Sequence, residues 1–428
     1  MTERIRTALS RGAALLAACS VTGAVALSSP AQAQPATGPA GPATPASGPA
    51  ASAQAHPAAP GSGTQSPQQQ AAATALLRQA STGGPPGNPA TVGGAQLAGS
   101  GVVVNAPAAP LPTVPASAYV IADAGTGQVL AAKDPHGLLR PASTLKMLTA
   151  VTLIPLLNPD ATVAASEQAT TVTPNVAGLV RGQPYKVSDL FYALLMISAN
   201  DAAIALAQAT GSLGNGVALM NAEAHHLQAY DVTAKDPNGL DAPGQHVSAY
   251  DLALIARQAL TMPELMNYDA TRETSFPVTA RKSETLFNQN DLLTKYPGGI
   301  GGKIGWTSAA GATYIGRARR NGVTLIVTVL HCQALTEVIN ASKLLNWGFA
   351  EDGKVRPVGR LVSPITAGAR PPARASGKPA PSQRPATSGD LTTTKIPGAP
   401  AAASIGLIVL AAAAAIVLIL LRRRSPLR

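Results

Sequence analysis

Two long stretches of this chain have a composition that cannot supply a hydrophobic core, and they restrict the folded part to the middle. Residues 34–111 consist mostly of Ala, Pro, Gly, Ser and Gln, with Arg78 as the only charged side chain. Residues 357–400 are rich in proline and basic. Neither stretch has regularly spaced apolar residues, so burial cannot offset the conformational entropy lost on ordering. We therefore expect one globular domain at residues 112–356 between two disordered linkers, with a brief helix near Leu76.

The net charge of +11 is carried by the flanking segments and not by the middle domain. Residues 112–356 contain 18 Lys plus Arg against 19 Asp plus Glu, which leaves the domain close to neutral. A nucleic-acid groove needs basic side chains clustered on a folded surface, so we exclude nucleic acid as a partner. A basic linker is better suited to an anionic cell surface.

Residues 1–33 are typical of a secretory signal peptide. Arginines near the N-terminus precede an apolar run at Gly12–Leu27 and an Ala-x-Ala cleavage site that ends at Ala33. Leu16–Cys19 also has the pattern of a lipoprotein cleavage site. Because the apolar run continues well past Cys19, we favour cleavage after Ala33.

The C-terminus is predicted to anchor the chain in a membrane. Residues 401–421 form an uncharged run of 21 residues, which would span about 32 Å as a helix and match a hydrocarbon core of ~30 Å. Residues 422–428 contain four arginines, and the positive-inside rule keeps such a tail in the cytoplasm. We therefore expect a single-pass protein of the cell membrane whose domain lies outside the cell.

The sequence predicts neither an intramolecular disulfide bond nor a metal site. Removal of the signal peptide takes Cys19 with it and leaves Cys332 as the only cysteine, so no intramolecular disulfide can form. Several histidines lack metal-ligand spacing to Cys, Asp or Glu, namely His225, His226, His246 and His331. We expect neither a metal nor a cofactor.

Three short motifs follow one another along the domain, and together they hold the groups of a nucleophilic site: Ser143–Lys146 (Ser-Thr-Leu-Lys), Ser198–Asn200 (Ser-Ala-Asn) and Lys303–Gly305 (Lys-Ile-Gly). Each motif alone is common in proteins without catalytic function, so the signal lies in the combination. Pro141 and apolar residues at near-helical spacing predict a helix over 142–156. On this helix the side chains of Ser143 and Lys146 share one face and can touch.

The chemistry requires a base, because a serine hydroxyl is a weak nucleophile until its proton is removed. Lys146 is the candidate base, provided that burial and a second cation such as Lys303 lower its pKa. The other motif residues have candidate roles as follows: Ser198 as a proton relay, Asn200 as the group that holds a substrate amide or fixes Lys146, and Gly305 as the space for a substrate backbone.

The combination resembles the signature of class A β-lactamases and penicillin-binding proteins. From about Ala118 to Phe349 the chain resembles the serine-type D-alanyl-D-alanine carboxypeptidases, which are the low-molecular-weight penicillin-binding proteins of peptidase family S11. Further segments carry the resemblance: Tyr119–Leu130, Arg140–Lys146, Asp236–Asp241, Gly244–Gln245, Ser248–Ala253 and Leu344–Phe349.

Strand patterns lie at both ends of the domain and helical patterns fill its middle. We expect strands at 118–122, 128–132, 301–305, 313–317 and 323–330, and helices at 142–156, 188–197, 201–210, 214–228, 248–260 and 335–347. This order favours an α+β domain in which the terminal strands share one antiparallel sheet flanked by helices. The resemblance implies the β-lactamase/DD-peptidase-like fold, with a cleft beside a mostly helical region. Because the chain runs into its linker soon after Asp352, we expect it to lack the C-terminal β-rich domain that many relatives have.

The resemblance also implies an activity in cell-wall remodelling. The terminal D-Ala of peptidoglycan stem pentapeptides would be removed through an acyl-enzyme on Ser143, and β-lactam antibiotics would act as covalent inhibitors. The backbone N–H groups of Ser143 and Trp306 would form the oxyanion hole. The expected substrate-binding residues are Asn200, Lys303, Ile304, Gly305, Trp306 and Thr307.

Two residues depart from the family pattern where the terminal carboxylate of the substrate is recognised. Ile304 stands where the family usually has threonine, and Glu337 falls near a position where several relatives carry arginine. Strict strand alternation would put Lys303, Gly305 and Thr307 on one side and Ile304 on the other. Because edge strands near a site often twist out of alternation, we predict that Ile304 faces the cleft.

Two other functions remain as alternatives. A β-lactamase would need a Glu-x-x-x-Asn loop between the second and third motifs, and only Glu284 and Asn288 have this spacing. They lie just before the third motif, so we discount the match. The second alternative is a wall-tethered penicillin-binding module with weak turnover, which Ile304 keeps open.

Overall fold

The computed structural model describes residues 63–82, 88–279 and 281–366. Within these ranges seven strands form a central sheet in which neighbouring strands are antiparallel. The sheet order is β1-β3-β2-β10-β9-β8, and β11 also pairs with β3. The strands are β1 (Val102–Val104), β2 (Ala116–Asp123), β3 (Gln128–Lys133), β8 (Gly299–Thr307), β9 (Gly311–Arg320), β10 (Val323–Cys332) and β11 (Gly359–Arg360).

The described helices are α1 (Pro67–Thr82), α2 (Leu145–Leu153), α3 (Glu167–Thr170), α4 (Val187–Met196), α5 (Asn200–Gln208), α6 (Leu213–His226), α7 (Ala249–Ala259), α8 (Pro263–Ala270), α9 (Asp291–Lys295) and α10 (Glu337–Glu351). Short 3-10 turns precede and follow α2, at Ala142–Thr144 and Ile154–Leu156. Two hairpins complete the set, β4 (Thr162–Ala164) with β5 (Pro184–Lys186), and β6 (Glu273–Thr279) with β7 (Lys282–Phe287). The expected α+β class, with helices between the terminal strands, is confirmed.

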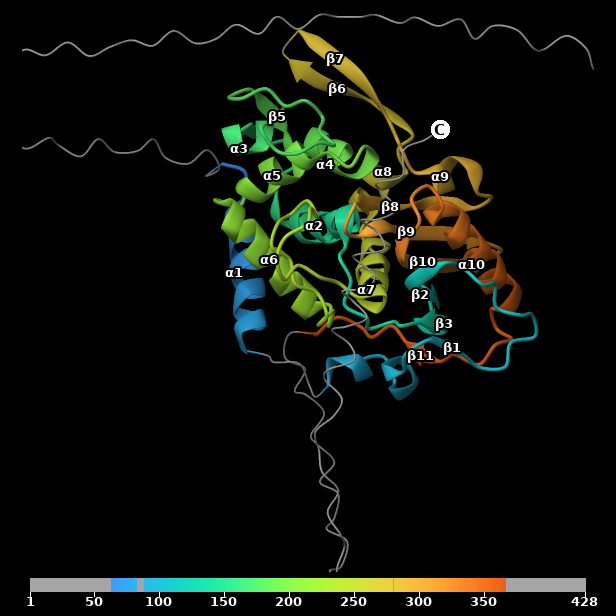
Figure 1. Cartoon of the computed structure of the whole chain (residues 1–428). Helices are drawn as coiled ribbons and strands as arrows, with labels where there is room; N and C mark the ends of the chain where they lie inside the picture. Colours follow the sequence, from blue (N-terminus) through green and yellow to red (C-terminus); the bar gives the residue numbers. More distant parts are fainter. Residues whose placement is uncertain (1–62, 83–87, 280, 367–428) are drawn as a thin grey trace, which may run out of the picture. The chain divides into compact units, whose positions relative to one another are not determined.

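Each face of the sheet buries a different helical layer. In β2 the residues Val120 and Ala122 join the core that contains α2 and α7, whereas Tyr119 and Ile121 join the core that contains α10. This split follows from the period of two in a strand, which sends successive side chains to opposite faces. Figure 1 shows α10 on one side of β10 and α7 on the other.

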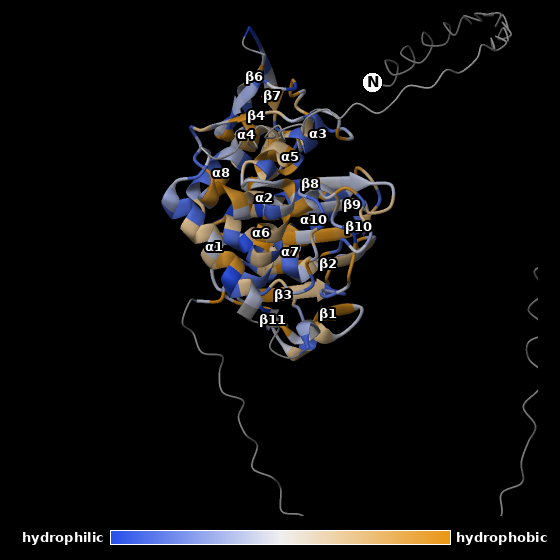
Figure 2. Ribbon diagram, turned by 90° about the vertical axis from the view of Figure 1, so that its left-hand side faces the viewer, coloured by the Kyte–Doolittle hydropathy of each residue, from blue (hydrophilic) through white to orange (hydrophobic). Residues whose placement is uncertain are grey.

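Helix α2 forms the centre of the helical layer. Every one of its residues is buried, including Lys146, and α4, α5, α6 and α7 pack around it. A helix that is apolar on nearly all sides must be enclosed in this way. Figure 2 shows apolar residues (orange) along these inner elements, while the tip of the β6–β7 hairpin is hydrophilic (blue).

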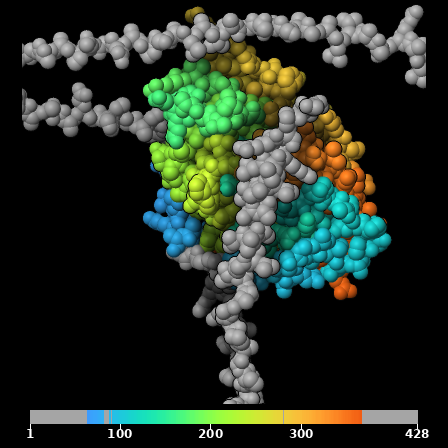
Figure 3. Space-filling view, in the orientation of Figure 1, coloured from blue at the N-terminus to red at the C-terminus, as the bar shows by residue number. Residues whose placement is uncertain are grey.

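Two predicted boundaries are wrong, because parts of the supposed linkers are folded. Within 34–111, α1 packs on α6 through Ala73 and Leu219, and β1 pairs with β3. Figure 3 shows α1 (blue) beside the green helical region. At the other end, β11 pairs with β3 and Leu361 is buried. Sparse apolar residues that cannot form a core alone are ordered here by packing on the domain. The helix expected near Leu76 is confirmed as α1.

The remaining segment predictions concern residues outside the described part of the chain. They are the signal peptide at 1–33, most of the linker at 357–400, the membrane helix at 401–421 and the basic tail at 422–428. Among the helices that the structure describes, none combines the length and the apolar character needed to cross a membrane.

Candidate active site

Ser143 lies on a tight turn that leads directly into α2. Ala142 adopts a positive φ of 46°, and Ser143 follows it in the 3-10 turn. The carbonyl of Pro141 accepts hydrogen bonds from Thr144 Oγ1 (2.5 Å) and Thr313 Oγ1 (2.8 Å). These bonds attach the turn to the sheet, so Ser143 is held on a rigid element. The predicted helix is confirmed, with its first and last turns in 3-10 geometry.

The Lys146 ammonium group is the centre of the site. Its side chain is fully buried, and Nζ donates to Ser143 Oγ (2.8 Å), Asn200 Oδ1 (2.6 Å) and the carbonyl of Asn238 (2.7 Å). A lysine ammonium has three donors, and here each one has an acceptor. The contact of Ser143 with Lys146, three residues later, is the one predicted from helical spacing. The Asn238 carbonyl was not predicted, because a backbone group leaves no signal in the sequence.

Electrostatics favour Lys146 as a base. Burial lowers its pKa well below the usual value of a lysine, and the charge of Lys303 lowers it further. The carboxylates of Asp236 and Asp201 act in the opposite direction. Burial also lowers the pKa of Lys303 to about 7, against the raising effect of Asp269. A lysine with a depressed pKa is deprotonated in a larger fraction of molecules near neutral pH and so can accept the serine proton.

The second motif forms the turn between α4 and α5. Ser198 has a positive φ of 62° and is half-buried, and its hydroxyl makes no hydrogen bond within the described residues. Asn200 is buried, and its Nδ2 donates to the carbonyl of Thr173 (2.7 Å) while Oδ1 accepts from Lys146. Of the two roles expected for Asn200, the structure shows the one that fixes Lys146. The relay role of Ser198 stays a prediction.

The third motif lies on β8, the edge strand next to the Ser143 turn. Lys303 is buried, and its Nζ donates to the carbonyl of Ile304 (2.8 Å). A Cβ atom at Gly305 would lie only 2.7 Å from the backbone nitrogen of Ser143 and would also collide with Thr313 Oγ1. Glycine is therefore required here by close approach. The backbone of Gly305 therefore lies directly beside the N–H of Ser143. The oxyanion hole formed by the backbone N–H groups of Ser143 and Trp306 stays a prediction.

The Ile304 side chain does not face the cleft. It is half-buried and packs against the apolar core between the sheet and α10, whereas Gly305 faces Ser143. The prediction that β8 departs from alternation at this point is wrong, because the strand keeps its period of two while pairing with β9 from Gly301 to Thr307. Thr307, on the same side as Gly305, is the better candidate for contact with a substrate carboxylate.

Replacing Ile304 with threonine should lower stability without a gain in rate. The change buries a hydroxyl in an apolar cluster, which costs about 1–3 kcal/mol of unfolding free energy in proteins. Chemical denaturation would measure this loss, and Ile304→Val would serve as the control that shortens the side chain without adding a polar group. A rise of about tenfold in kcat/KM for Ile304→Thr would show that the side chain reaches the substrate after all.

Replacing Lys303 with glutamine should shift the pH dependence of Ser143 acylation. The charge of Lys303 lowers the pKa of Lys146, so its removal should raise that pKa and move the acid limb of the acylation rate to higher pH. The shift should arise below about pH 7, where Lys303 is protonated in the native protein. Stopped-flow acylation by a β-lactam would measure it. Lys295→Gln, which removes an exposed cation of α9, should leave the limb in place.

The residues that suggested a β-lactamase lie outside this arrangement. Glu284 is on β7, more than half exposed, and it pairs with Lys282. Asn288 donates instead to the backbone carbonyls of Asp269 and Thr271. Glu337, the other departure, begins α10 as a buried carboxylate whose Oε2 has no hydrogen-bond partner in the described part of the chain. None of the three contacts Lys146 or Ser143.

A buried ion pair behind β8 was missed by the sequence analysis. Arg317 on β9 and Asp269 at the end of α8 are both fully buried and form an ion pair. Asp269 Oδ2 also accepts a hydrogen bond from the backbone N–H of Gly302 (2.8 Å), next to Lys303. The sequence alone did not mark this pair, because Arg317 lies close to Arg319 and Arg320 on the same strand and only Arg317 is fully buried.

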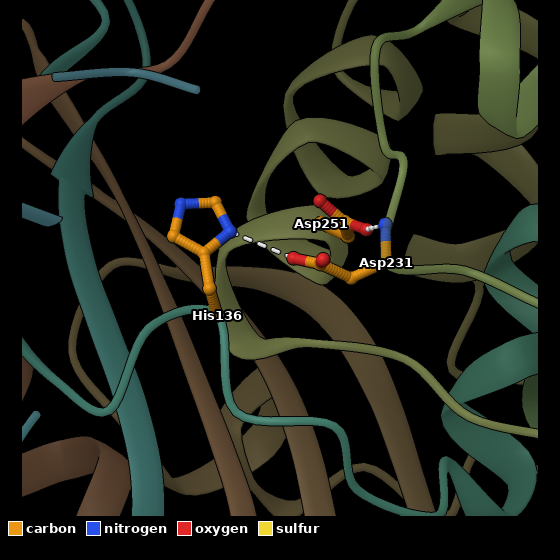
Figure 4. A group of neighbouring side chains, drawn as sticks. All are labelled: His136, Asp231 and Asp251. Atoms are coloured by element: carbon orange, nitrogen blue, oxygen red, sulfur yellow. Dashed lines mark hydrogen bonds and ion pairs between the residues drawn. The ribbon is translucent and has the colours of Figure 1, made fainter. Parts of the chain in front are cut away.

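A second polar cluster joins His136, Asp231 and Asp251, whose possible ligand atoms lie within 4.8 Å of one another (Figure 4). His136 Nδ1 contacts Asp231 Oδ2 (2.7 Å) and its Nε2 contacts the carbonyl of Val92 (3.1 Å). Asp251 Oδ2 accepts from the backbone N–H of Asp231 (2.7 Å). These atoms already form hydrogen bonds within the chain. We therefore interpret the cluster as structural, because it connects the loop after β3 to α7.

The comparisons with known proteins agree with this geometry. Residues 103–334 match the D-alanyl-D-alanine carboxypeptidase family of peptidases, S11, and the chain belongs to this family. It is 37% identical over 247 residues to D-alanyl-D-alanine carboxypeptidase DacB2 of Mycobacterium tuberculosis, covering 56% of this chain and 84% of the relative. It is 33% identical over 252 residues to DacD of Escherichia coli, covering 55% of this chain and 64% of that relative.

Solved structures give the same result. A D-alanyl-D-alanine carboxypeptidase from Mycobacterium tuberculosis is 36% identical with a TM-score of 0.57, covering 60% of this chain and 99% of the other. A serine-to-alanine mutant of the Streptomyces K15 DD-transpeptidase is 26% identical with a TM-score of 0.53, covering 56% of this chain and 99% of the other. The DD-peptidase fold expected from the sequence is therefore confirmed.

Proposed function

We propose that this chain is a serine-type D-alanyl-D-alanine carboxypeptidase that removes the terminal D-Ala from peptidoglycan stem pentapeptides during cell-wall remodelling. Membership of the family supports the reaction class. One observation carries the assignment of residues, namely the fully buried Lys146 with its Nζ 2.8 Å from Ser143 Oγ. The same nucleophile would be acylated irreversibly, or nearly so, by β-lactam antibiotics.

The first half of the reaction forms an acyl-enzyme. Lys146 Nζ removes the proton of Ser143 Oγ as the oxygen attacks the carbonyl carbon between the two D-Ala residues. The backbone N–H groups of Ser143 and Trp306 stabilise the resulting oxyanion, and each such donor is typically worth ~10²–10³ in rate. The C–N bond then breaks, and the leaving amine takes the proton through Ser198. Asn200 keeps Lys146 in place during these transfers.

The second half returns the enzyme to its starting state. A water molecule attacks the Ser143 ester while Lys146 accepts its proton. The ester C–O bond then breaks as Lys146 returns that proton to Ser143 Oγ, and the stem tetrapeptide leaves as a carboxylate after its carboxyl proton passes to solvent. Without this step the protein would remain acylated and act only as a penicillin-binding module. Deacylation therefore separates the carboxypeptidase from that alternative function.

One assay distinguishes the three candidate functions. A carboxypeptidase releases D-alanine from a stem pentapeptide over many turnovers and is inhibited covalently by penicillin. A β-lactamase hydrolyses penicillin with repeated turnover and releases no D-alanine. A weak binding module forms a stable penicilloyl adduct and releases at most one equivalent of D-alanine. We expect the first result, and either of the other two would overturn the proposal.

We also propose that residues 401–421 anchor the protein in the cell membrane and that residues 367–400 act as a spacer towards the wall. A proline-rich segment of this length would reach at most about 105 Å at ~3.1 Å per residue. Deletion of most of the spacer should leave activity on a soluble pentapeptide unchanged and reduce the trimming of wall peptides in cells. Equal trimming in cells would defeat the spacer role, and release of the full chain without detergent would defeat the anchor.

A further inference from the structure

Two hydrogen-bond donors converge on one carboxylate oxygen at the edge of the site. Arg140 Nη1 lies 3.3 Å from Asp241 Oδ1, and Thr307 Oγ1 donates to the same Oδ1 at 3.1 Å. The side chain of Arg140 is 49% exposed and that of Asp241 is 30% exposed. The carboxylate is therefore held by a guanidinium and a hydroxyl group in a position that solvent can reach.

All three residues are attached to segments that touch the Ser143 turn. Arg140 precedes Ser143 by three residues, and Thr307 follows Gly305 on the same side of β8. Asp241 follows Gly239, where a Cβ atom would collide with the carbonyl of Ala142. The arrangement of Arg140, Thr307 and Asp241, which we call the rim triad, thus lies beside the nucleophile.

The rim triad contains both an acceptor atom and donor groups that have no hydrogen-bond partner among the described residues. Among the described residues Asp241 accepts these two contacts through Oδ1 alone, and Oδ2 has no partner. Arg140 uses a single nitrogen, although a guanidinium can bind a carboxylate through two. A planar cation beside a hydroxyl group is a suitable receptor for a carboxylate, and Asp241 shows where such a group binds.

We propose that Arg140 and Thr307 bind the terminal carboxylate of the peptide substrate, and that Asp241 occupies this subsite when substrate is absent. The proposal rests on the carboxypeptidase function inferred above and names the subsite for the end of the substrate. Ile304 faces the core behind β8, and Glu337 is a buried acidic side chain that offers no cationic group, so neither supplies a binding group for the terminal carboxylate. Asp241 has the same charge as the substrate group and so competes with it.

The test compares two peptides that differ only in the charge of the last residue. Full-length protein would be assayed on a stem pentapeptide that ends in free D-Ala-D-Ala and on the same peptide with a C-terminal amide. Arg140→Gln should reduce kcat/KM for the free acid by about tenfold and leave the amide unchanged. Asp241→Asn should raise kcat/KM for the free acid several-fold, also without effect on the amide. Lys295→Gln, which removes an exposed cation of α9, should change neither value.

The outcomes separate the subsite from the function itself. If Arg140→Gln lowers the rates on both peptides equally, or Asp241→Asn lowers both, the rim triad only supports the fold and the proposal is overturned. If wild type releases D-alanine and the acid-to-amide ratio is the same in Arg140→Gln, the subsite fails while the carboxypeptidase stands. If wild type releases D-alanine from neither peptide, the function fails first. Melting temperatures of the variants would identify any loss caused by unfolding.

Discussion

Replacing Ser143 with alanine should abolish both covalent acylation and the release of D-alanine. The hydroxyl of Ser143 is the only one that accepts a hydrogen bond from Lys146 in the described structure. Removing a catalytic serine lowers kcat by roughly 10⁶-fold in well-studied hydrolases, because no other group can form the ester. Intact-mass measurement after incubation with penicillin should show one penicilloyl adduct on wild type and none on Ser143→Ala.

A matched control and a second variant sharpen this result. Ser342→Ala removes a hydroxyl from α10 that only bonds the carbonyl of Val338, so its acylation should equal that of wild type. Lys146→Met keeps the bulk of the buried side chain without a base, and its acylation should be slower by several orders of magnitude. A penicilloyl adduct that persists in Ser143→Ala would assign the nucleophile to another residue and overturn the mechanism.

The sequence was sufficient to predict what depends on local spacing. Ser143 and Lys146 are separated by less than one helical turn, so their contact followed from the helix period alone. The five strands and six helices named for the domain are present, with shifts of a few residues at their ends. The convergence of Lys303 and Asn200 on the same site was predicted from the combination of the three motifs and from the family resemblance, because residues so distant in sequence carry no local signal of contact.

What the sequence could not supply depends on contacts between distant segments. Helix α1 looked like linker because its few apolar residues are insufficient alone, yet they pack on α6. The β6–β7 hairpin has mixed polar residues and is largely exposed, so no hydrophobic pattern marked it. The direction of Ile304 was predicted wrongly because β8, although an edge strand near the site, keeps strict alternation. The partners of Asp269 and Asp241 are set by tertiary structure and leave no motif.

Replacing Arg317 with methionine should destabilise the fold strongly. Arg317 and Asp269 are both fully buried, and their ion pair supports the backbone of β8 at Gly302. Removing one partner of a buried pair leaves an uncompensated charge and typically costs about 3–5 kcal/mol. The free energy of unfolding from urea titration should fall by this amount in Arg317→Met. The double variant Asp269→Asn with Arg317→Met should recover much of the loss, because the amide oxygen still accepts from Gly302 without a buried charge.

The pH dependence of this loss identifies its cause. Burial already raises the pKa of Asp269, and the charge of Arg317 opposes that effect. Without Arg317 the pKa of Asp269 in the folded state should rise further above its value in the unfolded chain. Between these two pKa values the folded protein binds more protons than the unfolded chain, so the free energy of unfolding falls as pH rises. The free energy of unfolding of Arg317→Met should therefore be only slightly lower than that of wild type near pH 4 and much lower near pH 8. If lost packing against Met266 were the cause, the deficit would be the same at both pH values, and the double variant would recover nothing. A single variant within about 0.5 kcal/mol of wild type at pH 8 would contradict the assignment of this pair as a support of β8.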